Sequence, residues 1–147
     1  MAGPHMARVR VLPKQPHDQF LNLMHVADAI LDPVCFNGMN NSLDAFSVGT
    51  PVVTLPHLFQ RGRHTSGMYR RMGWMECVAQ SADDYVRRAV SLGNDADLRQ
   101  HARDEIAARA PVLFEEDQVV REFERFFIDA AQGRAQDQRA RGDTPPA

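Results

Sequence analysis

Small polar residues and one acid are concentrated in the stretch PVCFNGMNNSLD at positions 33–44. An apolar, strand-like run leads into this stretch and an apolar helical pattern follows it. A helix N-terminus leaves about four backbone N–H groups unpaired and carries about half a positive charge, so it binds an anion without a lysine. Gly38 lets the backbone come close or take a positive φ, and Asn40, Asn41 and Ser42 add short donors. The stretch is therefore suited to a phosphate group.

The acid in this stretch indicates a second ligand group. Asp44 would repel a phosphate, but its carboxylate is well placed for two vicinal hydroxyls beside one. A diphosphate on the helix end and a ribose on the acid together describe a nucleotide. The structural alternative is an Asn-Gly turn, Ser42 as N-cap and Asp44 as an acid favoured by the helix dipole, and composition alone favours this alternative.

The loop LPKQPHDQF at positions 12–20 is stiffened by prolines and offers Lys14, His17 and Phe20 as a cation, a donor and an aromatic face. Such a loop could hold a nucleotide base by backbone hydrogen bonds and stacking. The alternative is that Phe20 belongs to the core, His17 begins a helix and Lys14 is solvated. Because Phe20 lies on the apolar stripe of the helix, the core position is favoured for it.

A third polar loop contains Arg61, Arg63 and His64 at the start of a helical pattern. Cations at a helix N-terminus oppose the helix dipole, which is costly unless an anion lies nearby. A phosphate in the neighbouring loop would explain these residues. Solvated surface charge explains them equally well.

The sequence contains few signals of other chemistry. The histidines form no ligand-spaced pair with Cys or Asp, so no metal or other cofactor is expected. The sequence contains no nucleophile elbow, no G-x-G-x-x-G and no Walker A motif. Cys35 and Cys77 lie in apolar stretches and are expected to be buried free thiols.

The elements that must position these loops follow a β-α-β spacing. Apolar runs rich in Val, Ile and Leu alternate with helical patterns, and a parallel sheet is typical of such alternation. We therefore predict an α/β, Rossmann-like fold with about four strands and flanking helices, followed by helices only from residue 81. Gly49 and Gly73 are expected to end the helices before them, and Ser81 is expected to cap the helix that follows it. The predicted strands are 8–13, 29–34, 51–56 and 75–79.

Composition bounds the class of protein. The net charge of −2 argues against a nucleic-acid partner or a polybasic membrane surface, and no apolar run approaches the length of a membrane helix. A cytoplasmic location is the simplest expectation. We predict a cloning scar at 1–6, one domain at 7–131 and a disordered tail at 132–147. Since the chain opens on a strand, we expect it to begin inside a domain.

The stretch at positions 27–56 resembles a known family of enzymes. The run ADAILDPVCFNGMNNSLDAFSVGTPVVTLP resembles the donor-binding half of the O-linked N-acetylglucosamine transferases and their bacterial, SPINDLY-type relatives with tetratricopeptide repeats. The resemblance rests on an ordered set of positions and extends more loosely from about Arg8 to near Ala131. The matching positions are Leu31, Asp32, Asn37, Gly38, Asn40 to Ser42, Asp44, Gly49 and Pro51.

The resemblance implies part of the C-terminal domain of a GT-B glycosyltransferase that uses a UDP-sugar. It places the diphosphate at Asn40 and Asn41, the ribose on Asp44, and uracil near Gln15, His17 and Phe20. Animal members carry a histidine where Met39 stands, which removes a phosphate donor. The implied nucleotide-sugar site comprises Lys14, Gln15, His17, Phe20, Asn37, Gly38, Met39, Asn40, Asn41, Ser42, Asp44 and Arg63.

The resemblance also implies partners and an activity. The parent enzyme would transfer a sugar, UDP-GlcNAc or a related donor, to protein without a metal ion, and would bind the acceptor protein through a half that this chain lacks. The fragment itself is expected to be inactive and mostly monomeric. The rival interpretation is a non-enzymatic α/β module that binds a partner or resembles a receiver, with Asp32 at a strand end but without a receiver's acidic cluster.

The last helical pattern is strongly amphipathic. Its stripe of Phe114, Val119, Phe123 and Phe126 is too apolar to stay in water, so we expect it to pack on the rest of the protein. Phe127 lies off the centre of the stripe and is the residue expected to remain exposed.

Overall fold

The structure is a computed structural model that describes residues 6–132. It divides into two compact units, with the boundary between Leu113 and Phe114, and each unit is described by itself. The predictions for residues 1–5 and 133–147, which include most of the predicted scar and tail, lie outside the described residues.

A small parallel sheet forms the centre of the first unit. Strand β1 (Ile30–Leu31) pairs with β2 (Val52–Val53), with Ile30 opposite Val52 and Leu31 opposite Val53. A single parallel bridge between Thr54 and Val78 extends the sheet. The parallel α/β arrangement is therefore as predicted, whereas only two of the four predicted strands form, and the run at 75–79 contributes one bridge.

The predicted strand at 8–13 is wrong. A short 3₁₀ helix, η1 (Met6–Arg8), is followed by extended chain without ladder partners, and Val11 is 93% exposed. A strand needs a neighbour to satisfy its backbone groups, and no strand of the described chain lies against this segment. Val9 and Leu12 are also exposed, so the apolar run gains no buried face.

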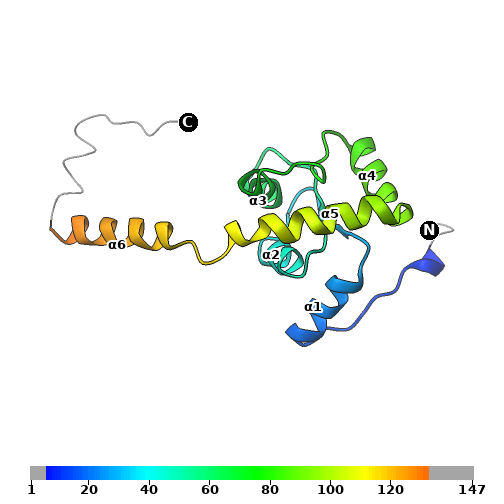
Figure 1. Cartoon of the computed structure of the whole chain (residues 1–147), viewed down its shortest axis with the longest axis horizontal. Helices are drawn as coiled ribbons and strands as arrows, with labels where there is room; N and C mark the ends of the chain where they lie inside the picture. The colour runs from blue at the N-terminus through cyan, green and yellow to red at the C-terminus, as the bar shows by residue number, and fades with distance from the viewer. Residues whose placement is uncertain (1–5, 133–147) are drawn as a thin grey trace. The chain divides into compact units, whose positions relative to one another are not determined.

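Three helices precede or follow the strands in the first half of this unit, and Figure 1 labels each of them. They are α1 (His17–Val26), α2 (Asn40–Ser47) and α3 (His64–Met72), with a 3₁₀ turn, η2 (Gln60–Gly62), before the third. Helix α2 makes the crossover between the two parallel strands. Gly49 and Gly73, with φ of 73° and 68°, follow α2 and α3 in the left-handed conformation that favours glycine, as predicted.

The second half of the first unit is helical, as predicted. It comprises α4 (Ala82–Asn94), α5 (Ala96–Arg109) and η3 (Ala110–Leu113), and α5 packs on α4 and α2 (Figure 1). Ser81 caps α4 by accepting a 3.1 Å hydrogen bond from the Asp84 N–H. Asp95 caps α5 in the same way, with 2.9 Å from the Leu98 N–H to its Oδ1.

The core lies between the sheet and the helices. Tyr69 of α3 is fully buried and packs edge-on against Phe46 of α2, with ring centroids 4.9 Å apart. Its hydroxyl donates to the Val52 carbonyl and accepts from the Val52 N–H, both at 2.9 Å. The side chain therefore replaces a neighbouring strand beside Val52. The other core residues are Met24, Ala45, Val53, Met72, Trp74, Cys77, Leu92, Ala102, Ile106 and Ala110.

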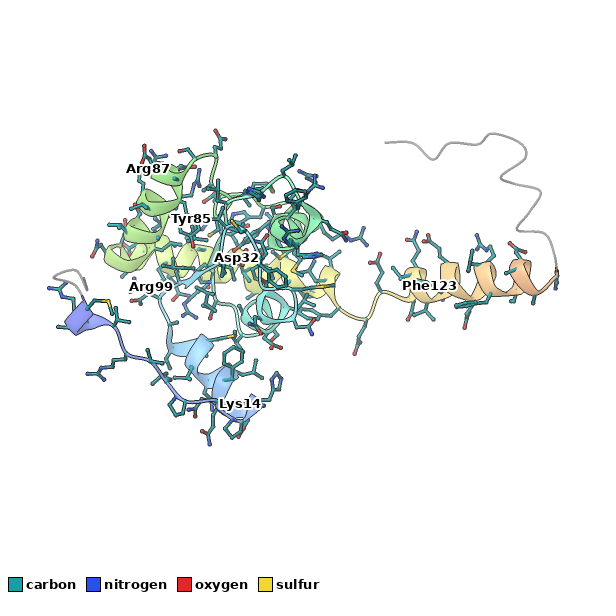
Figure 2. All side chains as sticks on the ribbon, turned by 180° about the vertical axis from the view of Figure 1, so that it is seen from behind. Lys14, Asp32, Tyr85, Arg87, Arg99 and Phe123 are labelled. Carbon is teal, nitrogen blue, oxygen red and sulfur yellow. The ribbon has the colours of Figure 1, made fainter. Side chains whose placement is uncertain are left out.

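The second unit contains α6 (Asp117–Ala131). Phe123 and Phe126 are each 59% exposed and Phe127 is 63% exposed, so Phe127 does not stand apart as predicted; Figure 2 labels Phe123 on this helix. Within the helix, the Phe123 and Phe127 rings stack with centroids 6.3 Å apart. Across residues 6–132, none of the helices is both long and apolar enough to cross a bilayer.

Candidate functional site

The N-terminus of α2 lies just beyond the carboxyl end of β1, where open α/β sheets bind ligands. Its N-cap residue, Met39, makes no side-chain capping hydrogen bond. The first backbone bond of the helix runs from the Leu43 N–H to the Met39 carbonyl, at 3.2 Å. The N–H groups of the first turn, including those of Asn40 and Asn41, are therefore directed out of the helix end.

Gly38, the residue before the N-cap, is held on both sides. Its N–H donates to Oδ1 of Asp32 at 2.8 Å, and its carbonyl accepts a hydrogen bond from the Ser42 hydroxyl. A Cβ at Gly38 would lie 3.2 Å from Cβ of Asn41 and 3.4 Å from Oγ of Ser42. Its φ is not positive, so of the two predicted uses of this glycine the structure shows close approach.

Ser42 and Asn37 serve the framework of the loop. Ser42 is buried, and its hydroxyl lies 2.8 Å from Oγ1 of Thr65 on α3. Asn37 is also buried, and its Nδ2 donates to the Pro33 carbonyl at 2.9 Å. Its backbone N–H donates to the Arg61 carbonyl at 2.7 Å, which joins the loop after β1 to the loop after β2.

The exposed groups at this helix end come from two elements. Asn40, Asn41 and Met39 are exposed on α2, and the Asp44 side chain is 27% exposed. Across from them, His17 begins α1, and its Nε2 lies 3.9 Å from Oδ1 of Asp44. The structure thus brings together two residues that the sequence assigned to one nucleotide site from separate loops.

The segment before α1 and the first turn of that helix contain further residues that the sequence assigned to the site. Lys14 is exposed on the segment that leads into α1 (Figure 2), and Gln15 turns its Nε2 back to the Pro13 carbonyl at 2.9 Å. Phe20 is half-buried against the core, as its place on the apolar stripe predicted.

A cleft of about 320 Å³ opens between α1 and α2 beside β1. Apolar side chains form most of its wall, and polar groups of the loop after β1 form one edge, an arrangement typical of small-molecule sites. Its lining residues are Phe20, Leu23, Met24, Ala27, Ile30, Leu31, Asp32, Pro33, Gly38, Asn41, Ser42 and Val52.

The loop after β2 uses its arginines differently. The Arg61 guanidinium lies 4.6 Å from the centroid of the Phe59 ring, a cation–π contact. Arg63 is the exposed N-cap residue of α3, and its carbonyl accepts from the Ser66 hydroxyl at 2.9 Å. The structure therefore gives Arg61 a partner within its own loop and leaves the Arg63 side chain at the surface.

Sequence reasoning assigned no role in the site to the residues that hold the loop after β1 from the interior of the unit. Asp32 accepts from the Thr54 hydroxyl at 2.7 Å as well as from Gly38, and the Tyr85 hydroxyl donates to the Asp32 carbonyl at 3.0 Å. Burial, and then the negative charge of Asp32, raises the pKa of Tyr85, which keeps its hydroxyl protonated as a donor. The signal in the sequence was an acid placed between two apolar runs at a strand end.

The described residues contain no cluster of three or more His, Cys, Asp or Glu side chains suited to a metal ion. Cys77 is buried as predicted, whereas Cys35 is exposed, contrary to the prediction for it. Because Cys35 lies in the loop after β1, where the strand has already ended, its apolar neighbours do not enclose it.

Comparison with known proteins identifies the family. The model of Glycosyl transferase family 41 matches residues 4–122, and the chain belongs to this family of transferases. A curated relative is the UDP-N-acetylglucosamine--peptide N-acetylglucosaminyltransferase of Caenorhabditis elegans, 33% identical over 101 residues, which are 67% of this chain and 9% of the relative.

A second relative, the UDP-glucose:protein N-beta-glucosyltransferase of Actinobacillus pleuropneumoniae serotype 5b (strain L20), is 28% identical over 92 residues, 62% of this chain and 15% of that protein. Among solved structures, the Thermobaculum terrenum O-GlcNAc transferase mutant K341M matches with a TM-score of 0.74 and 27% identity. That match covers 86% of this chain and 26% of the other. The chain thus spans a minor part of each relative.

Proposed function

We propose that this chain is the donor-binding part of a GT-B protein glycosyltransferase that uses a UDP-sugar, with UDP-GlcNAc or a related nucleotide sugar as donor. The observation that carries the proposal is the meeting of His17 and Asp44, 3.9 Å apart, beside the uncapped N-terminus of α2. Membership of Glycosyl transferase family 41 supports it, because relatives in the comparison are named for UDP-sugar donors and peptide or protein acceptors.

The diphosphate is proposed to bind at the N-terminus of α2. The free N–H groups of the first turn and the positive end of the helix dipole attract the anion. The side chains of Asn40 and Asn41 add neutral donors that do not fill the space. Met39 cannot donate a hydrogen bond to the phosphate, so we expect this contact to be weaker than in animal members of the family.

The nucleoside is proposed to lie between α2 and α1. Asp44 would accept hydrogen bonds from the two ribose hydroxyls, as a carboxylate can accept two at once. His17 and Phe20 of α1 would lie beside uracil, with the backbone near Gln15 pairing with the base edge. Lys14 and Arg63 are exposed cations, and we assign them to this site, where they would add electrostatic attraction for the diphosphate.

Asn37, Gly38 and Ser42 are assigned to the same site with a different role. Their contacts with Pro33, Asp32 and Thr65 hold the loop in place, so they would shape the phosphate site from behind.

We propose that the parent enzyme needs no divalent metal ion for donor binding, because the helix N-terminus and neutral donors would carry the diphosphate charge. The acceptor protein would bind through parts of the parent outside this chain, with a side-chain hydroxyl or amide as the group that receives the sugar. The fragment alone would bind nucleotide without turnover. The proposed location in the cell stays cytoplasmic, as the sequence predicted.

The rival interpretation is a non-enzymatic α/β module that binds a partner or resembles a receiver, and membership of a transferase family favours the glycosyltransferase over it. A receiver binds a divalent ion with an acidic cluster, and the described residues contain no such cluster.

Isothermal titration calorimetry with UDP, ADP and CDP tests the proposal. We expect UDP to bind in the millimolar range or tighter, ADP and CDP at least about tenfold more weakly, and 1 mM EDTA to leave the UDP affinity unchanged, tenfold being about 1.4 kcal/mol. Equal affinity for the three nucleotides would contradict the uracil assignment. A tenfold gain on adding magnesium would contradict the metal-free mechanism.

A further inference from the structure

Asp32 directly follows β1 in the chain. It is 2% exposed and lies in the middle of the first unit, next to Tyr85 (Figure 2). Its N–H donates to the Val53 carbonyl at 3.0 Å, and its carbonyl accepts from the Tyr85 hydroxyl at 3.0 Å. The backbone of this residue is therefore fixed from both sides, by the neighbouring strand and by α4.

The carboxylate of Asp32 connects two loops. Oδ1 accepts from the Gly38 N–H at 2.8 Å, and Oδ2 accepts from the Thr54 hydroxyl at 2.7 Å. Burying an acid is costly unless its oxygens are paired, and here each oxygen has a donor. Hydrogen bonds to a carboxylate are stronger than those between neutral groups, so Asp32 holds the Gly38 N–H and the Thr54 hydroxyl firmly.

The hydrogen bond between Asp32 and Gly38 affects the first turn of α2. Gly38 precedes the N-cap residue Met39, so its position sets where the helix begins. Its N–H is held by Asp32, and its carbonyl by the Ser42 hydroxyl. Loss of the Asp32 contact would leave the N–H of the half-buried Gly38 without this partner and would free the loop between β1 and α2 to move.

We propose that Asp32 is a positioning residue for the donor diphosphate: by holding the Gly38 N–H, it fixes the N-terminus of α2 and the direction of the helix N–H groups that bind the anion. This inference deepens the proposed function and rests on it. Asp32 acts through Gly38 and does not itself touch the nucleotide. Preorganised donors bind an anion better than mobile ones, because the cost of ordering them is met during folding.

Two substitutions and one control test this role. Asp32→Ala removes both acceptors. Asp32→Asn keeps the shape, since its Oδ1 can accept from Gly38 while its Nδ2 donates to the Thr54 hydroxyl, which can turn to accept. Leu92→Ala truncates a buried apolar side chain of α4 that makes none of the bonds to Asp32 or Gly38, and it is the control for general loosening of the unit.

The readouts are hydrogen exchange at the Gly38 amide and the Kd for UDP, with thermal unfolding to define the temperature range in which each variant is folded. We expect Asp32→Ala to speed Gly38 exchange and raise the Kd for UDP at least about fivefold. We expect Asp32→Asn to restore both to within about threefold of the unaltered chain, and Leu92→Ala to lower the unfolding temperature with the Kd unchanged.

The two readouts must change together in every folded variant. Faster Gly38 exchange with an unchanged Kd would overturn the proposal, and so would a raised Kd with unchanged exchange, which would indicate a charge effect. If Asp32→Ala does not fold, Asp32→Asn is judged by the same rule. A failure of the unaltered chain to bind UDP rejects the proposed function and the role built on it, and is distinct from these outcomes because it appears before any substitution is made.

Discussion

Nε2 of His17, the first residue of α1, lies 3.9 Å from Oδ1 of Asp44 on α2. The two side chains come from the helices that precede and follow β1 in the chain, and the pairing of the strands does not require them to meet. Their proximity places the residue that we propose to lie beside the base and the residue that we propose to bind the ribose within the span of one nucleoside. Both side chains are accessible to solvent, so a ligand can reach them.

Replacing Asp44 with alanine is expected to weaken UDP binding without unfolding the chain. The loss leaves ribose hydroxyls without an acceptor, at about 1–3 kcal/mol, or about fivefold to 150-fold in Kd. Calorimetry gives the Kd, and circular dichroism gives the unfolding temperature. Asp83→Ala removes an exposed acid on α4 and is the matched control. Early melting of the Asp44 variant with an unchanged Kd would make Asp44 a structural residue.

Asn41→Asp separates helix stability from anion binding. A carboxylate in the first turn of α2 favours the helix dipole by about 0.3–1 kcal/mol, so the unfolding temperature should not fall. The same charge repels a diphosphate, so we expect the Kd for UDP to rise at least about tenfold while the Kd for uridine changes by less than about twofold. A variant that binds UDP as well as the unaltered chain does would place the phosphates elsewhere.

The two cysteines should react at very different rates. Cys35 is exposed, whereas burial raises the pKa of Cys77 to about 12, which keeps it in the unreactive thiol form at neutral pH. A disulfide reagent at pH 8 should modify one thiol within seconds to minutes and the second only on unfolding. Cys35→Ser should abolish the fast phase. Two fast phases in the folded chain would show that the core around Cys77 opens.

Asp84 should make the first unit sensitive to acid. A hydrogen bond from the Gln80 N–H, and then the Arg88 side chain, lowers the pKa of Asp84 below its ordinary value. A lowered folded-state pKa stabilises the fold above the unfolded-state pKa, near 3.9, and this contribution is lost as pH falls through the folded value. Urea unfolding at pH 7 and pH 3 should therefore show a smaller pH difference for Asp84→Asn. An unchanged difference would assign the acid sensitivity to other carboxylates.

The sequence predicted the elements whose signals are local. Ser81 as a helix cap, Gly49 and Gly73 after helices, and the apolar stripe that places Phe20 against the core all depend on neighbours within a few residues. The segment 8–13 was mispredicted because a strand forms only when another strand pairs with it. The residues of the segment alone do not show whether such a partner is present. The same limit applies to 75–79, where only Val78 meets the sheet.

The sequence could not predict which polar residues hold the loop after β1 in place. Ser42 and Asn37 have the residue types of ligand donors, yet the structure pairs them with Thr65 and Pro33. The position of Asp32 at a strand end is visible in the sequence, but its partners are not, since Thr54 comes from the next strand. Contacts between residues far apart in the chain decide whether a polar side chain supports a loop or faces a ligand.

Mapping of amide chemical shifts during a UDP titration tests the central claim most directly. Because the chain spans a minor part of its relatives, weak binding is expected and the titration should reach millimolar UDP. The proposed site predicts shifts in two segments, Gln15 to Phe20 and Gly38 to Asp44, that saturate with one Kd, and little change along α6. An absence of shifts in both segments at millimolar UDP, or shifts confined to other parts of the chain, would contradict the assignment of this helix end as a UDP-sugar site.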